Sequence, residues 1–141
     1  MQVTRIVFWT VLIALLAGCA SLGASREEAL RRRVTAFWDA RLAGDLVTQY
    51  DYEAASRTGK TTLQKYVSSK GGIRYLSYRI EAIRFPEPGR AEVDLVLKYL
   101  VPPVITKPVE ARITQNWVLI DGQWYHQEKR RRPKKPAKPS A

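Results

Sequence analysis

The spacing of apolar residues changes once along the chain, and this change separates the predicted helices from the predicted strands. Between residues 25 and 42, apolar positions recur every three or four residues, which is typical of a helix with one buried face. This stripe consists of Leu30, Val34, Phe37, Trp38, Arg41 and Leu42. The capping-box pattern Ser25-Arg26-Glu27-Glu28 predicts the start of this helix, and Gly44 predicts its end.

Two shorter helices are expected after Gly44. Asp45 is placed to cap the first of them, whose apolar side chains are Leu46, Val47 and Tyr50. A polar stretch follows, and Thr61 with Gln64 then predicts the cap of a helix that Gly71-Gly72 ends. The apolar side chains of that last helix are Leu63, Tyr66 and Val67.

After Gly72 the apolar residues alternate with polar ones, which is the period of a strand with one buried face. The alternation predicts strands over residues 76–83 and 91–99, with a turn at residues 86–89 between them. Proline has no backbone N–H to donate to a neighbouring strand. Pro102-Pro103 and Pro108 therefore predict a loop or a ragged edge after the second strand.

A final hairpin is the best-defined part of the predicted sheet. Residues 109–120 and 123–128 flank Asp121-Gly122, a pair that favours a two-residue type I′ turn and so fixes the register. Directly opposite residues share a face, and the residues predicted to lie together are Ile113, Trp117, Leu119, Trp124 and His126. The order of elements predicts an α+β domain over residues 25–128, with N-terminal helices packed on one face of an antiparallel sheet.

Two segments of this domain resemble a known superfamily. Residues 37–45 with Tyr50, and Trp117 followed by the segment 121–125, are similar to the nuclear transport factor 2-like proteins of the ketosteroid isomerase-like group. The resemblance implies a cone of three helices against a strongly curved antiparallel sheet. The superfamily includes isomerases, cyclases and dehydratases as well as non-catalytic binding and assembly modules. Its members often dimerise through the sheet, so the resemblance also allows a homodimer.

The N-terminus carries the pattern of an export signal. Arg5 precedes an apolar run over residues 6–17, which is shorter than the roughly 20 residues that a membrane span needs. Leu16-Ala17-Gly18-Cys19 resembles the bacterial lipoprotein box, which implies cleavage between Gly18 and Cys19 and acylation of Cys19. We therefore expect a signal peptide at residues 1–18, a tether at 19–24 and a lipid anchor in a membrane.

The resemblance to lipoproteins also implies a compartment. In that class, aspartate directly after the modified cysteine retains the protein at the inner membrane, and this chain has Ala20 there. The expected location is the outer membrane, facing the periplasm, with the outer leaflet of the inner membrane as the alternative. Cys19 is the only cysteine, so the domain forms no internal disulfide.

His126 is the only histidine of the chain and the one candidate for proton transfer. A catalytic imidazole also needs an oriented partner, and Asp51 and Tyr78 are the candidates. The other interpretation places His126 at the end of the last strand, half-covered by Trp117. The sequence points to no cofactor, and a lone histidine without a ligand spacing predicts no metal. A loose phosphate-loop pattern at residues 54–61 lacks the preceding apolar strand that such a loop requires.

A ligand pocket inside the cone is the second candidate site. Apolar clefts with a few polar groups are the usual small-molecule sites, and the pocket candidates are Tyr78, Trp117, Trp124 and His126. The alternative is that the aromatic residues form the core of a small domain.

Positive charge is concentrated at the C-terminus. The chain has a net charge of +11, and residues 129–141 combine three prolines with Lys129, Arg130, Arg131, Arg132, Lys134, Lys135 and Lys138. This composition predicts a disordered tail. It either solubilises the chain or contacts anionic lipid, peptidoglycan or an acidic protein. The export signal argues against nucleic acid as its partner.

Three functions remain open at this point. The first is a lipid-anchored, non-catalytic binding or assembly module of the cell envelope. The second is an isomerase-, cyclase- or dehydratase-like enzyme that uses His126 in the cone. The third is a structural tether that contacts the cell wall or anionic lipid through its basic tail.

Overall fold

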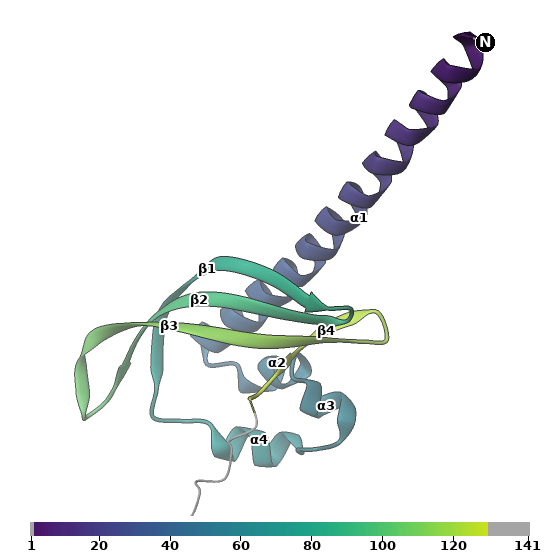
Figure 1. The fold of residues 1–141 in the computed structure, drawn as a ribbon. Helices are drawn as coiled ribbons and strands as arrows, with labels where there is room; N and C mark the ends of the chain where they lie inside the picture. Colours follow the sequence, from purple (N-terminus) through teal and green to yellow (C-terminus); the bar gives the residue numbers. More distant parts are fainter. Residues whose placement is uncertain (1, 130–141) are drawn as a thin grey trace, which may run out of the picture.

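The computed structural model describes the backbone of residues 2–129 and the side chains of residues 23–129. Within residues 2–129, four helices precede four strands: α1 (Gln2–Ala43), α2 (Leu46–Asp51), α3 (Ala54–Thr58), α4 (Leu63–Ser69), β1 (Arg74–Glu87), β2 (Arg90–Val101), β3 (Ile105–Ile120) and β4 (Gln123–Gln127). The strands form one antiparallel sheet in the order β1-β2-β3-β4, and the helices pack against it (Figure 1). The predicted α+β class, with helices ahead of an antiparallel sheet, is confirmed.

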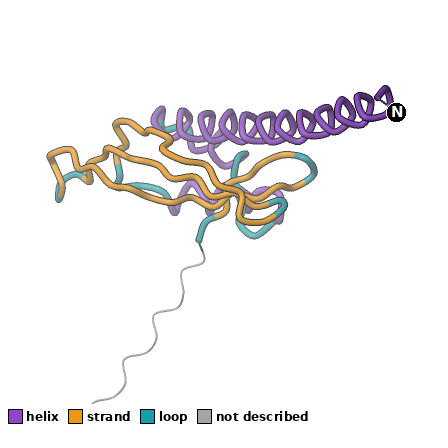
Figure 2. Tube along the Cα trace, turned by 45° about the horizontal axis from the view of Figure 1, so that its top comes forward, coloured by secondary structure: helices purple, strands orange, loops and turns teal. Residues whose placement is uncertain are grey.

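Helix α1 is much longer than the sequence pattern predicts. It runs unbroken from Gln2 and includes residues 19–24, so the predicted helix start at Ser25 is wrong. A capping box works only where the preceding chain is not helical, and here Ala20, Leu22 and Ala24 continue the helix from the leader with good helix formers. The N-terminal part of α1 extends away from the rest of the chain (Figure 2).

The end of α1 and the cap of α2 are confirmed. Gly44 has a φ of 72°, the left-handed conformation that follows many helices. The Asp45 carboxylate accepts a hydrogen bond of 3.0 Å from the Thr48 N–H, and this bond lowers the Asp45 pKa. Helix α4 begins after Thr62 rather than Thr61, and the Thr62 hydroxyl accepts from the Lys65 N–H. The polar stretch before it contains the additional short helix α3.

The predicted hairpin register is confirmed residue by residue. Ile120 pairs with Gln123, Leu119 with Trp124, and Trp117 with His126. Asp121 and Gly122 both have positive φ angles, 48° and 78°, as a type I′ turn requires. The register matters for the site because it places the His126 side chain on the face of the sheet that Trp117 shares.

Two of the prolines near the end of β2, Pro102 and Pro103, lie between β2 and β3, whereas Pro108 lies within β3. Pro102-Pro103 lies in the predicted loop, but β3 already starts at Ile105, so the prolines do not keep residues 105–108 out of a strand. Tyr99 pairs with Val109 and Val101 with Ile105, which leaves residues 106–108 in an irregularity of the ladder. Pro108 fits there because a residue at a bulge loses no ladder hydrogen bond.

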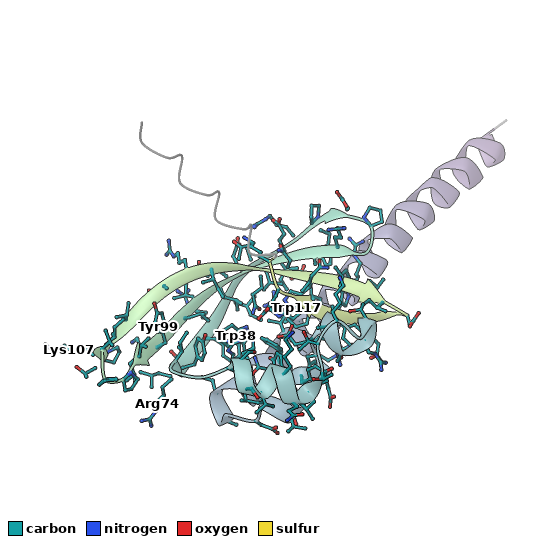
Figure 3. The ribbon with its side chains drawn as sticks, turned by 90° about the horizontal axis from the view of Figure 1, so that it is seen from below. Trp38, Arg74, Tyr99, Lys107 and Trp117 are labelled. Carbon is teal, nitrogen blue, oxygen red and sulfur yellow. The ribbon has the colours of Figure 1, made fainter. Side chains whose placement is uncertain are left out.

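The core lies between α1 and the sheet. Its most deeply buried side chains come from the α1 stripe and from β2, β3 and β4: Leu30, Val34, Phe37, Trp38, Ala91, Val93, Leu95, Leu97, Trp117 and Trp124. Trp38 and Trp117 lie between the helices and the sheet, whereas Arg74, Tyr99 and Lys107 lie toward the other end of the strands (Figure 3).

Helices α2 and α4 bury only part of the apolar side chains that the sequence pattern suggests: Tyr66 is buried as expected, whereas the other buried side chain is the polar Gln49. Val47, Leu63 and Val67 are exposed. Leu119, which shares the inner face of the hairpin, is also exposed. Among the residues whose side chains are described, no helix is long and apolar enough to cross a membrane.

Candidate functional site

His126 lies beside the chain segment that leads into α3. The His126 N–H donates a hydrogen bond of 2.8 Å to the Tyr52 carbonyl oxygen, and Glu53 forms a parallel bridge with His126. This backbone pairing places the two side chains together, and the imidazole Nδ1 lies 2.9 Å from Glu53 Oε2. His126 is 7% exposed and Glu53 only 3%. The two titratable groups therefore form a buried pair that joins β4 to the helices.

Tyr66 of α4 completes this buried group. Its hydroxyl donates a hydrogen bond of 3.0 Å to Glu53 Oε1, the carboxylate oxygen that His126 does not contact. Burial raises the pKa of Tyr66 well above its usual value, and the negative charge of Glu53 raises it further. Tyr66 therefore stays protonated at neutral pH and acts as a donor. The Glu53 carboxyl group thus has a polar side-chain partner at each oxygen, one from α4 and one from β4, which offsets the cost of its burial.

Aromatic rings enclose the imidazole. The Phe37 ring of α1 lies 4.9 Å from the His126 ring between centroids, and the Trp117 indole of β3 lies 5.7 Å away in an edge arrangement. The predicted neighbour Trp117 is thus confirmed, and Phe37 is an additional one. The cover is more complete than the half-covered position that the sequence predicts.

Neither of the partners that the sequence offers for His126 pairs with it. Asp51 is exposed at the end of α2. The Tyr78 hydroxyl donates instead to Asp39 Oδ1 at 2.9 Å, and partial burial together with Asp39 raises the Tyr78 pKa. Glu53 was missed because it lies in a polar stretch with no helical or strand period. Only its pairing with a strand 73 residues away in sequence reveals it.

The four predicted pocket residues do not share one cavity wall. Trp117 and His126 lie together, but Trp124 packs against Phe85 at 5.7 Å between ring centroids. Tyr78 stacks on Trp38 at 5.7 Å on another part of the sheet. Trp117 is 0% and Trp124 3% exposed.

Besides Arg33 Nη2, two fully buried side chains have polar groups without a hydrogen-bond partner among the described residues. They are the side-chain amide of Gln49 and the indole Nε1 of Trp117. Buried polar atoms in proteins normally have a partner.

A cleft of about 360 Å³ opens where α1, α2, α3 and β4 meet. We call it the arginine cleft. Its charged residues are Arg33, Arg57 and Asp51, and its polar residues are Tyr50, Ser56, Gln123 and Tyr125. None of the four pocket residues predicted from the sequence lines it. The residues 54–61, which match a loose phosphate-loop pattern, form α3 and a turn rather than a loop after a strand.

Several of the remaining predicted site residues lie outside the described part of the chain. Gly18 and Cys19 belong to α1, but their side chains are outside the described residues. Lys129 is the last described residue. The other tail cations lie outside the described residues: Arg130, Arg131, Arg132, Lys134, Lys135 and Lys138. Within the described part of the chain, no three His, Cys, Asp or Glu residues gather as a metal site.

Comparison with known proteins identifies a similar fold but indicates no activity. No protein-family model and no curated protein matches the chain. The fold is similar to the solution structure of a SEC-C motif-containing protein from Rhodopseudomonas palustris, with a TM-score of 0.51 and 12% sequence identity. The similarity covers 64% of this chain and 69% of that one. At this identity the likeness shows a shared fold alone.

Proposed function

We propose that this chain is a lipid-anchored protein of the cell envelope whose domain is a non-catalytic binding module. The anchor rests on the lipobox-like segment 16–19 behind a leader of the right length. The absence of catalysis rests on the enclosure of His126 by Phe37, Trp117 and Glu53. We further propose that the domain is a nuclear transport factor 2-like cone, which the helices packed against a four-stranded antiparallel sheet support.

The enclosure of His126 is the observation that carries the non-catalytic assignment. A general acid or base must come within hydrogen-bond reach of a substrate proton. The His126 ring is 7% exposed, its Nδ1 is paired with Glu53, and its backbone N–H is paired with Tyr52. The pair therefore fixes β4 to the segment before α3, which is a structural role.

Acylation by diethyl pyrocarbonate tests this assignment, because the chain contains a single histidine and the absorbance of the product reports on it alone. We expect His126 in the folded chain to react at least about tenfold more slowly than in urea, since reaction requires local opening. A matched rate in the two conditions contradicts the proposal. It favours the enzyme alternative, which the His126–Glu53 pair supports chemically.

The geometry of α1 supports an anchor that lies close to the domain. The Arg26 guanidinium stacks on the Phe85 ring at 4.0 Å, so α1 contacts the sheet at this point. A helix rises about 1.5 Å per residue, which puts Cys19 only about 10 Å from this contact along the helix. The lipid therefore holds the domain close to the membrane surface, at the outer membrane given Ala20. The basic tail from Lys129 onward is then available to anionic lipid, peptidoglycan or an acidic partner.

A further inference from the structure

Two arginines of the arginine cleft are arranged around one tyrosine ring. The Arg33 Cζ lies 4.9 Å and the Arg57 Cζ 5.3 Å from the centroid of Tyr125. The Arg57 Nε–H also donates a hydrogen bond of 2.9 Å to the Tyr125 hydroxyl, which in turn donates to Gln123. Tyr125 is 2% exposed and rigidly held in β4. Helices α1 and α3 thus direct two positive charges toward the same point of the sheet.

Neither of these arginines has an acidic partner within the described residues. Arg33 donates from Nε to the Trp124 carbonyl oxygen at 2.9 Å, stacks on Tyr52, and leaves Nη2 buried without a hydrogen-bond partner. The two arginines before it on α1 behave differently, because Arg31 pairs with Glu27 and Arg32 with Glu28. A partly buried guanidinium without a counter-charge is costly. The cleft therefore holds two guanidinium groups that form no ion pair within the described part of the chain, and Asp51 in its lining offsets only part of their charge.

We propose that the arginine cleft binds an oxyanion, namely the phosphate or carboxylate group of a small ligand. The planar guanidinium presents paired N–H donors that match the oxygens of either group. A volume of about 360 Å³ suits a small molecule. Asp51 also lines the cleft and opposes part of the positive charge, which disfavours ligands with several negative charges. This inference rests on the proposed binding role and names the ligand class for it.

Titration of the isotope-labelled full-length chain in an uncharged detergent tests the proposal, with backbone amide signals as the readout. Inorganic phosphate and acetate are added separately at constant ionic strength. We expect saturable shifts at Tyr125 and Arg57 with at least one of them. Saturation by phosphate alone assigns a phosphate-bearing ligand, and saturation by acetate assigns a carboxylate. No saturable shift with either anion overturns the proposal.

Matched variants separate a site from general attraction to a basic protein. Arg57→Gln is expected to weaken binding about tenfold or more, because a charge-assisted hydrogen bond is lost. Arg32→Gln lies on the exposed side of α1 and should leave the dissociation constant unchanged. Arg57→Lys keeps the positive charge but lacks the paired N–H donors of the guanidinium. Its affinity for the anion is expected to lie between those of Arg57→Gln and Arg32→Gln. Equal weakening by Arg32→Gln and Arg57→Gln overturns the proposal.

The two proposals fail in distinguishable ways. Loss of the anion site leaves the slow acylation of His126 unchanged, and rapid acylation of His126 leaves the anion titration readable. His126 does not line the cleft, so the Arg57 variants do not disturb the acylation measurement at His126.

Discussion

Replacement of Trp117 by alanine is expected to lower the free energy of unfolding by about 3–5 kcal/mol. Trp117 is fully buried in β3 and contacts Phe37 of α1 at 5.7 Å and His126 of β4 at 5.7 Å between ring centroids. Its removal leaves a cavity at the point where helix and sheet meet. A domain of this size has a total stability of about 5–15 kcal/mol, so the loss is a large share.

Chemical unfolding of the full-length chain, followed by circular dichroism, measures this effect. Leu119→Ala is the matched control, because Leu119 lies two residues further along β3 on the same face and is 42% exposed. We expect it to cost less than about 1 kcal/mol. A loss at Trp117 no larger than the loss at Leu119 contradicts a tightly filled interior and favours a ligand pocket between the helices and the sheet.

Glu53→Ala is expected to lower the free energy of unfolding by about 2–5 kcal/mol, since it leaves two buried polar groups without a partner. The imidazole of His126 and the hydroxyl of Tyr66 both lose their carboxylate partner, and neither is placed to reach water. A buried donor without a partner carries its full desolvation cost. Glu28→Ala, which removes an exposed carboxylate paired with Arg32, is the control and should change stability by less than about 0.5 kcal/mol.

A double-mutant cycle shows whether Glu53 acts through Tyr66. Tyr66→Phe removes the hydroxyl and keeps the ring, so its cost added to that of Glu53→Ala should exceed the cost of the double variant. Additive costs indicate that the two side chains do not interact, which contradicts the hydrogen bond of 3.0 Å between them.

The hairpin shows which parts of the fold a sequence determines locally. Asp121-Gly122 admits one turn type, and that turn fixes every pair from Ile120 with Gln123 to Trp117 with His126. The buried stripe of α1 was predictable for a similar reason. Four of its residues, Leu30, Val34, Phe37 and Trp38, lie at most 1% exposed because their spacing puts them on one helix face.

The start of α1 was not predictable from Ser25. The capping pattern is a local preference worth about 1 kcal/mol, and a helix already present upstream overrides it. The strand around Pro108 was not predictable for a similar reason, because the irregularity that accommodates it depends on the pairing of β3 with β2. Local rules fail where the neighbouring segment decides the conformation.

The candidate sites depend on contacts between distant parts of the chain. Glu53 lies 73 residues before His126. In the arginine cleft, Arg33 hydrogen-bonds a carbonyl 91 residues away, and Arg57 a hydroxyl 68 residues away. Arg33 follows two arginines that face solvent, and nothing in the sequence separates it from them. Arg33 differs from these two arginines only because β4 packs beside α1 in the folded domain.

The intact mass of the protein purified from membranes of a Gram-negative host tests the lipid anchor most directly. The unprocessed chain has a mass of 16.1 kDa. The account predicts loss of residues 1–18 and the added mass of acyl chains on Cys19, and predicts that Cys19→Ala is neither acylated nor recovered with membranes. An unmodified mass of 16.1 kDa for the wild type, in the soluble fraction together with the variant, contradicts it.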